Sequence, residues 1–171
     1  MNAIFEEFMN FEQIYQRLFK PVLNYIYSRV SGDTAAEDIA CLVWQKVYQN
    51  LEQFDPEKGL PEQWIFTIAR NETNKYFRFQ KLKRFFVLFE EESTQSKEKP
   101  LLDILSTQEQ NYFLFNALEI LSKREKDLIS LKFFSGLNNR QIASVTQLSE
   151  SNVGTILNRA LKKLREELEQ V

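Results

Sequence analysis

Residues 138–168, NNRQIASVTQLSESNVGTILNRALKKLREEL, decide the fold of the C-terminal part of this chain. A short segment with helical periodicity, residues 140–146, is followed by a tight turn at residues 147–149 and by a longer amphipathic segment, residues 150–168. Two helices joined by such a turn predict a helix-turn-helix. The apolar stripe of the longer helix is formed, at helical spacing, by Val153, Ile156, Leu157, Ala160, Leu161, Leu164 and Leu168.

Helix-start signals precede these two helices and one more. Ser122 with Glu125, and Asn138 with Gln141, have the spacing of a capping box, in which each side chain accepts a hydrogen bond from the other residue's backbone amide. Ser149 is a typical N-cap for the last helix. The C-terminal block therefore predicts three helices.

The exposed side of the last helix has the chemistry of a nucleic-acid contact. Small and hydrogen-bonding side chains near a helix N-terminus can approach base edges, and an arginine can bind guanine through two hydrogen bonds. The alternative is a plain solvated helix in an αα-hairpin. The candidate residues are Arg140, from the preceding helix, with Ser151, Gly154, Thr155, Asn158, Arg159, Lys162 and Lys163.

Residues 1–84 carry the periodicity of a first helical block. Apolar side chains recur at helical spacing over residues 11–30, and Pro21 should kink or break that helix. Thr34 and Glu37 have the spacing of a capping box, which predicts the start of a second helix.

The second helix should run to about Leu51 and be followed by a turn at residues 54–59, FDPEKG. Pro61 suits the first position of a third helix, which should run to about Arg84. The apolar stripe of the third helix is formed by Trp64, Ile65, Ile68, Ala69 and Tyr76.

The other side of the third helix is basic. Between Arg70 and Arg84 the sequence holds six basic residues and one acid, Glu72. Asparagine interleaved with arginine suits simultaneous contacts to bases and phosphates. The alternative is an ordinary solvated charged face. At about 100° per residue, the residues that share this side are Arg70, Asn71, Asn74, Arg78 and Lys81.

A partly apolar face on the second helix is a candidate protein-binding surface. Ile39, Ala40, Val43 and Val47 should point toward the core. An exposed leucine and cysteine beside an acid are typical of a protein–protein contact. The alternative is packing against another helix of the same domain. The residues of this face are Asp38, Cys41, Leu42 and Gln45.

The two helical blocks are separated by residues 85–105, FFVLFEEESTQSKEKPLLDIL. Their acidic and polar tract with a proline predicts a linker, and residues 106–171 form the second block. No segment shows the alternation of a strand. We therefore expect an all-α protein of two small helical domains joined by a linker, the C-terminal one a helix-turn-helix.

The overall composition is that of a globular protein, with 43% hydrophobic and 27% charged residues. A net charge of −2 argues weakly against nucleic-acid binding, but phosphate contacts depend on local patches. The single cysteine indicates a reducing, cytoplasmic setting. Because the chain shows neither a signal peptide nor an apolar stretch of spanning length, we expect no membrane insertion.

The residues needed for catalysis are largely missing. The chain has no histidine and one cysteine, which removes the usual zinc ligand sets and the histidine-based triads. No nucleophile–base pair or glycine-rich phosphate loop occurs. We therefore expect a protein that is not an enzyme and needs no cofactor or metal.

Motifs in both blocks carry a family resemblance. They are AEDI (36–39), FDPEKG (54–59) and WIFTIARN (64–71), then Ile142, Ala143, Ser149, Val153, NRAL (158–161), Leu164 and Arg165. In this order they resemble the extracytoplasmic-function (ECF, group IV) sigma factors of the sigma-70 family. The resemblance covers nearly the whole chain, and it implies a factor that directs RNA polymerase to promoters and initiates transcription in response to an environmental or envelope signal.

The first block is similar to sigma region two. The resemblance implies that its helix of residues 34–51 binds the clamp helices of the polymerase β′ subunit through Asp38 and its neighbours. It also implies that the loop of residues 54–59 receives a flipped-out base of the minus-ten promoter element, which requires a pocket. The implied minus-ten residues are Phe54, Asp55, Lys58, Arg70, Asn71, Asn74, Lys75 and Arg78.

The second block is similar to sigma region four, whose recognition helix enters the major groove at the minus-thirty-five element. The resemblance further implies a contact with the β flap of core RNA polymerase and control by an anti-sigma factor. The implied minus-thirty-five residues are Arg140, Ser151, Gly154, Thr155, Asn158, Arg159 and Lys162.

Several positions depart from the family pattern. Cys41 and Leu42 stand where glutamine and an acid are usual, so the polymerase contact is expected to be more apolar. Gly154 replaces a usual basic residue, which should weaken the minus-thirty-five contact or change its specificity. Gln147 occupies a turn position where glycine is common.

Two other readings of the chain remain open at this point. Residues 106–171 alone would permit a LuxR-like helix-turn-helix regulator that is not a polymerase subunit. Residues 34–78 argue against it, because such a regulator has no need for their order of motifs. A sigma-like protein that regulates without initiating is the other reading. Dependence of specific DNA binding on core polymerase separates these possibilities.

Overall fold

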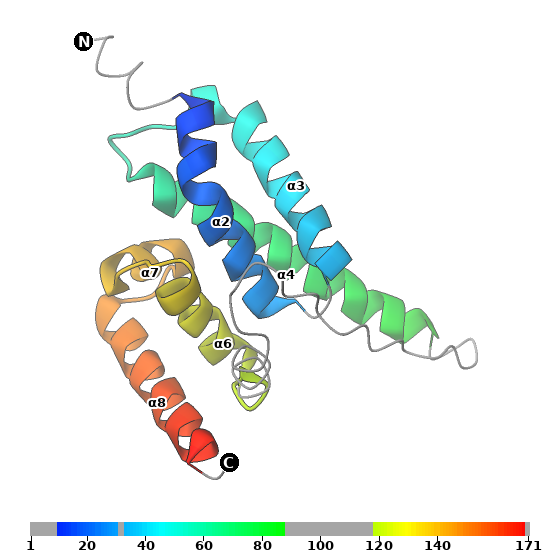
Figure 1. Cartoon of the computed structure of the whole chain (residues 1–171), viewed down its shortest axis with the longest axis vertical. Coiled ribbons are helices and arrows are strands. Elements are labelled where there is room, and N and C mark those ends of the chain that lie inside the picture. The colour runs from blue at the N-terminus through cyan, green and yellow to red at the C-terminus, as the bar shows by residue number, and fades with distance from the viewer. Residues whose placement is uncertain (1–9, 31–32, 88–117, 170–171) are drawn as a thin grey trace.

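The computed structural model describes residues 10–30, 33–87 and 118–169, and over these ranges the chain is helical with no strand. This confirms the all-α prediction. Figure 1 shows the helices in chain order. They are α2 (Phe11–Arg29), α3 (Asp33–Gln49), the 3-10 turn η1 (Leu51–Gln53), α4 (Pro61–Val87), α6 (Lys123–Ile129), the π-helical turn η2 (Ser130–Phe134), α7 (Asn139–Thr146) and α8 (Glu150–Leu168).

The N-terminal lobe, residues 10–87, is a bundle in which α2, α3 and α4 all pack against one another. Its centre is aromatic: the Tyr25 and Phe66 rings meet edge to face, with their centroids 6.1 Å apart. The core of this lobe contains Ile14, Leu18, Val22, Tyr25, Ile26, Ile39, Val43, Val47, Ile65, Phe66 and Ala69.

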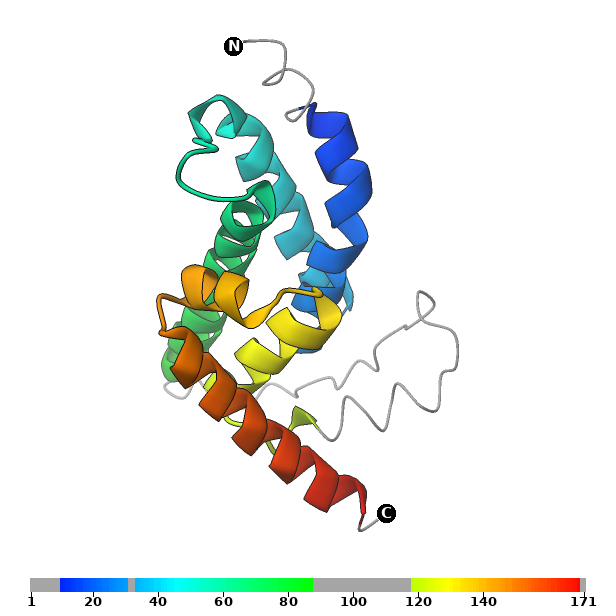
Figure 2. The same ribbon diagram turned by 90° about the vertical axis from the view of Figure 1, so that its left-hand side faces the viewer.

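In the C-terminal lobe, residues 118–169, α6 and α7 pack against the long helix α8, and η2 packs against α6 and α7. Figure 2 shows α8 running along the outer side of this lobe. Leu161 and Leu168 were predicted to lie on the apolar stripe of α8, but they are 40% and 50% exposed, because the short helices of this lobe cover a narrower face than the stripe spans. The core contains Leu118, Leu128, Leu131, Leu137, Ile142, Val145, Val153, Leu157, Ala160 and Leu164.

The helix starts of the C-terminal lobe follow the predicted capping signals. Ser122 with Glu125 and Asn138 with Gln141 form complete capping boxes. The hydroxyl of Ser149 accepts a hydrogen bond from the amide of Asn152 at 3.2 Å. These signals are local in sequence, which is why they could be recognised without a fold.

In the N-terminal lobe the break that was one of the two outcomes predicted at Pro21 does not occur, and the second helix begins one residue early. Pro21 lies inside α2, which continues without a break. Its neighbours Leu18 and Val22 are both buried, so core packing on either side outweighs the backbone hydrogen bond that proline removes. The second helix begins at Asp33, one residue before Thr34, so Thr34 lies in the first turn and not at the predicted cap.

The two lobes are in direct contact. Helix α4 packs against α7, and α2 packs against η2, so that the C-terminal lobe lies along one side of the N-terminal bundle (Figures 1 and 2). The buried apolar residues of both lobes belong to one connected cluster. This arrangement had no counterpart in the sequence prediction.

Candidate nucleic-acid interface

The helix-turn-helix is built by α7 and α8, and α8 presents a polar face to solvent. Val153, Leu157, Ala160 and Leu164 face the core. On the other side the side chains are short or end in hydrogen-bonding groups, which suits contact with base edges. The predicted residues Arg140, Ser151, Thr155, Asn158, Arg159 and Lys162 are exposed, and Gly154 is half-buried.

The turn between these helices depends on an unusual backbone conformation at Gln147. This residue has φ 60° and ψ 34°, a left-handed conformation that side chains with a Cβ rarely adopt. Its side-chain amide donates to the carbonyl of Ser144 at 2.9 Å. The amide of Leu148 donates to the carbonyl of Ala143 at 3.1 Å, which closes the turn. Glycine, common at this position, would adopt the same conformation without strain.

Gly154 is not required by packing. A Cβ added there would meet the side-chain nitrogen of Asn139 at 3.8 Å, an ordinary van der Waals separation. The first atom of a larger side chain therefore fits on this face of α8.

The basic face predicted on α4 is present, and its one acid is turned inward. Glu72 is buried and pairs with Lys46 of α3 at 2.6 Å and with Lys75 at 3.1 Å. Burial would raise the pKa of Glu72, but the hydrogen bonds from the two lysines hold it below its ordinary value. The carboxylate is thus neutralised within the lobe, and the outer side of α4 stays basic. On that side Asn71, Lys75 and Arg78 are exposed, while Arg70 and Asn74 are half-buried.

The loop of residues 54–59 is ordered by its own side chains. Asp55 accepts a hydrogen bond from the Glu57 amide at 3.0 Å and pairs with Lys58 at 2.9 Å. The Lys58 ammonium and the Glu57 amide lower the pKa of Asp55. Phe54 is buried, with its ring centroid 5.3 Å from that of Trp64. Phe54 therefore shapes the loop mostly from inside, and only a small part of it is accessible, on the wall of the neighbouring cavity.

A cavity of about 250 Å³ adjoins this loop. Its walls come from the loop, from the first turns of α4 and, on one side, from the C-terminal lobe. The lining residues are Gln53, Phe54, Asp55, Lys58, Gly59, Leu60, Gln63, Trp64, Thr67, Ser144 and Gln147.

The predicted protein-binding face of α3 is open to solvent. Ile39, Ala40, Val43 and Val47 are buried as predicted. The opposite side is accessible, with Leu42 47% exposed. All four residues of this face, Asp38, Cys41, Leu42 and Gln45, are exposed.

Comparison with known families matches both lobes. The model of Sigma-70 region 2 matches residues 14–82, and the model of Sigma-70 region 4 matches residues 114–164. The chain is an ECF sigma factor of the sigma-70 family. It is therefore a non-enzymatic subunit of RNA polymerase that recognises promoters and binds DNA through the helix-turn-helix of region four. As a sigma factor it binds core RNA polymerase, which excludes the LuxR-like alternative.

Relatives and solved structures extend over nearly all of this sigma factor. The ECF RNA polymerase sigma factor RpoE of Cereibacter sphaeroides is 28% identical over 158 residues, covering 92% of this chain and 86% of the relative. SigX of Bacillus subtilis is 26% identical, covering 93% and 84%. The fold matches that of the sigma factor RpoE of Bartonella quintana, solved with the anti-sigma factor NepR (TM-score 0.75, 21% identity, covering 93% and 96%). CnrH, solved with the cytosolic domain of CnrY, is similar (TM-score 0.69, 20% identity, covering 94% and 88%).

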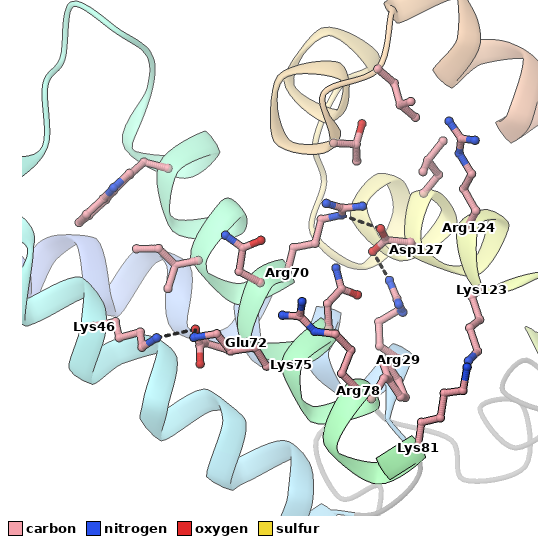
Figure 3. A pocket seen from close by; sticks show the side chains of 18 of the residues that line it. Arg29, Lys46, Arg70, Glu72, Lys75, Arg78, Lys81, Lys123, Arg124 and Asp127 are labelled. Atoms are coloured by element: carbon pink, nitrogen blue, oxygen red, sulfur yellow. Dashed lines mark hydrogen bonds and ion pairs between the residues drawn. The ribbon is translucent and has the colours of Figure 1, made fainter. Parts of the chain in front are cut away.

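Region two and region four of this sigma factor enclose a basic cavity of about 990 Å³. Figure 3 shows Arg70 and Arg78 of α4 on one side and Arg124 and Asp127 of α6 on the other. The α4 residues predicted to bind the minus-ten element all line this cavity, and Arg70 among them pairs with Asp127 of region four. These residues are Arg70, Asn71, Asn74, Lys75 and Arg78.

Asp127 is the site residue that the sequence prediction missed. It is buried, and it accepts hydrogen bonds from Tyr25 at 2.8 Å, from Arg29 and from Arg70 at 2.7 Å. Burial, together with the Asp127 carboxylate, raises the pKa of Tyr25 well above its ordinary value. One signal was present in the sequence: Asp127 lies four residues before the buried Leu131, which places an acid on a core-facing stripe.

None of the described helices combines the length and the apolar character that a membrane crossing requires.

Proposed function

We propose that this sigma factor binds core polymerase chiefly through the exposed side of α3, on the clamp helices of the β′ subunit, with a second contact between region four and the β flap. Two features support the first contact. The side of α3 away from the core is accessible, and it combines an acid with an exposed leucine, a mixture found at protein interfaces. The proposed contact residues are Asp38, Cys41, Leu42 and Gln45.

The outer side of α4 and the neighbouring loop bind the minus-ten element. The observation that carries this proposal is that the Glu72 side chain points into the lobe. The proposed DNA-binding side of α4 therefore carries only basic and amide side chains. The region-two walls of the cavity beside residues 54–59, which come from the loop and the first turns of α4, would hold an unstacked base. The proposed residues are Phe54, Asp55, Lys58, Arg70, Asn71, Asn74, Lys75 and Arg78.

Helix α8 binds the minus-thirty-five element in the major groove. Its exposed side offers one arginine, two asparagines and two hydroxyl groups over its first three turns. The absence of a side chain at Gly154 removes a phosphate or base contact from the centre of this side. The proposed residues are Arg140, Ser151, Gly154, Thr155, Asn158, Arg159 and Lys162.

An anti-sigma factor controls this protein in the cytoplasm in response to a signal. The support is the fold that it shares with the sigma factor RpoE of Bartonella quintana, solved with the anti-sigma factor NepR, and with CnrH, solved with the cytosolic domain of CnrY. The exposed α3 face and the α4 face are the surfaces that such a partner would cover.

The direct test is run-off transcription with core RNA polymerase on a pool of genomic promoter fragments from the source organism. The wild-type protein should produce new transcripts that share two spaced upstream elements, and Asp38→Arg should abolish them. Glu12→Arg is the matched control: it makes the same charge change at an exposed position of the same lobe, outside the proposed surfaces, and should leave transcription unchanged. Equal transcription by Asp38→Arg would refute the α3 contact.

A further inference from the structure

A single buried carboxylate joins the two regions of this sigma factor. Asp127 belongs to α6 of region four, and its recorded partners all belong to region two: Tyr25 and Arg29 of α2 and Arg70 of α4. Figure 3 shows Arg29 and Arg70 reaching toward Asp127 from neighbouring helices. The side chains of Asp127 and Arg29 are 6% and 5% exposed, so the pair lies inside the contact and not at its edge.

This cluster is satisfied only when the regions are docked. A charge withdrawn from water is tolerated when it is paired and hydrogen-bonded. Here two guanidinium groups and a phenol meet one carboxylate, and both of its oxygens accept a hydrogen bond. An unpaired buried charge would be strongly unfavourable, so the cluster specifies this docked arrangement over others with similar apolar contact.

Docking also occupies the surface that we propose for the minus-ten element. The Nε atom of Arg70 is held by Asp127. Ser144 and Gln147 of region four form one wall of the cavity beside residues 54–59. Thr146 and the neighbouring Leu148 line the larger cavity over α4. Region four therefore lies where a promoter strand would have to pass.

We infer that Asp127 is an internal competitor for promoter DNA, whose carboxylate takes the place of a phosphate on Arg70 and holds region four over the minus-ten surface of region two in the free protein. This inference rests on the proposed function of α4. DNA and the docked region four bind the same surface, so each shifts the population away from the other. Loss of the Asp127 charge should raise the open fraction and the affinity for DNA together.

The opening can be measured by energy transfer within the full-length protein. Cys41 is the only cysteine of the chain and is exposed on region two, and Glu166→Cys adds a second labelling site on the exposed side of α8 in region four. Asp127→Asn should lower the transfer efficiency. Tyr25→Phe removes one hydrogen bond but keeps the charges, so it should lower the efficiency less.

Glu119→Gln is the matched control for charge. It removes one carboxylate from the same lobe, at an exposed ion pair with Lys126 that does not reach region two, and its transfer efficiency should equal that of the wild type. In a parallel assay at low salt, Asp127→Asn should bind a short random-sequence DNA duplex about fivefold more tightly than Glu119→Gln. Equal transfer and equal DNA affinity for these two variants would overturn the inference.

Circular dichroism shows whether Asp127→Asn stays folded. If its helical signal is lost, the test uses Tyr25→Phe instead. An energy-transfer efficiency equal to that of the wild type in this variant would contradict a docked state that depends on this cluster. The inference and the proposed function fail separately. If the wild-type protein supports transcription but Asp127→Asn leaves the energy-transfer efficiency unchanged, only the competitor role of Asp127 is refuted. Absence of transcription in the wild type refutes the proposed function, while the transfer measurement still reports on docking.

Discussion

At the scale of single residues, Gln147 and Gly154 of the helix-turn-helix are residue types that packing does not require at their positions. Gln147 holds a left-handed backbone where glycine would fit without strain. Gly154 leaves room on the polar side of α8. Each predicts a substitution with a defined direction.

Gln147→Gly should stabilise the protein. It removes a left-handed cost of about 1–2 kcal/mol, from which the extra freedom of glycine in the unfolded chain subtracts about 0.5–1 kcal/mol. Urea unfolding should therefore show a gain of about 1 kcal/mol or less. Both variants lose the exposed bond from the Gln147 side chain to Ser144, but only Gln147→Ala keeps the strained backbone, so it should give no gain. An equal gain from alanine would show that strain at this φ is not the cause.

Gly154→Lys should strengthen DNA binding through one added phosphate contact. The expected signature is a salt dependence of the binding constant that is steeper by about one counterion, with higher affinity at low salt. Gly154→Ala is the control, because it makes the same backbone change without charge. Identical salt slopes for the two variants would place position 154 away from the DNA.

At the scale of elements, the short-range capping signals of the C-terminal lobe were predictive, whereas the capping box at Thr34 did not mark the start of α3. The caps at Ser122, Asn138 and Ser149 depend on residues three positions apart, so the sequence alone locates these helix starts. Pro21 shows the opposite case, because its effect on α2 is decided by the helices packed around it. Capping residues therefore predict where a helix starts better than a proline predicts whether a helix is interrupted.

The start of α6 should make the stability of region four depend on pH. Glu125 completes the capping box of α6 and accepts hydrogen bonds from Lys163 of α8 at 2.8 and 2.9 Å. The Lys163 ammonium lowers the pKa of Glu125 despite partial burial. A carboxyl with a lowered folded pKa contributes stability above its unfolded pKa of about 4.3 and loses it as pH falls through the folded value.

Lys163→Ala should therefore lower the free energy of unfolding by about 0.5–1 kcal/mol at pH 7, since half of the lysine is exposed. The difference from the wild type should shrink as the pH falls below the unfolded pKa of glutamate, about 4.3, and vanish once Glu125 is protonated in the folded protein as well. Thermal unfolding followed by circular dichroism measures both. Lys162→Ala removes an exposed ion pair with Glu166, 3.7 Å long, and should change the free energy of unfolding little at either pH. A loss of stability equal to that of Lys163→Ala would contradict the role assigned to Glu125.

At the scale of the whole molecule, the docking of the two regions was beyond sequence reasoning. Asp127 lies 98 positions from Arg29 and 57 from Arg70. No helical periodicity connects residues so far apart, and contacts of this kind arise only from the tertiary fold. The predicted minus-ten residues were found together on α4 and its loop, but the prediction gave no sign that region four faces them.

Docking should also make the two regions unfold together. Both tryptophans of the chain, Trp44 and Trp64, lie in region two, so their fluorescence reports on that region. Leu157→Ala removes a buried side chain of region four and should cost about 2–5 kcal/mol. In the wild-type background it should lower the midpoint seen by tryptophan fluorescence, because the two cores are continuous.

The same substitution in an Asp127→Asn background should leave the tryptophan midpoint near that of Asp127→Asn alone. Leu168→Ala, at a half-exposed position of the same helix, should have a small effect in both backgrounds. A tryptophan midpoint insensitive to Leu157→Ala in the wild type would mean that the regions unfold independently.

The contact centred on Asp127 lies within one chain, and this decides how the protein responds to its own abundance. An equilibrium between two forms of the same molecule has no concentration in its constant, so synthesis of more protein multiplies closed and open forms alike. Gene dosage then changes how many molecules exist but not the fraction that is ready to work. The open fraction is instead set by the side chains at positions 25, 29, 70 and 127, and it is the same at every expression level.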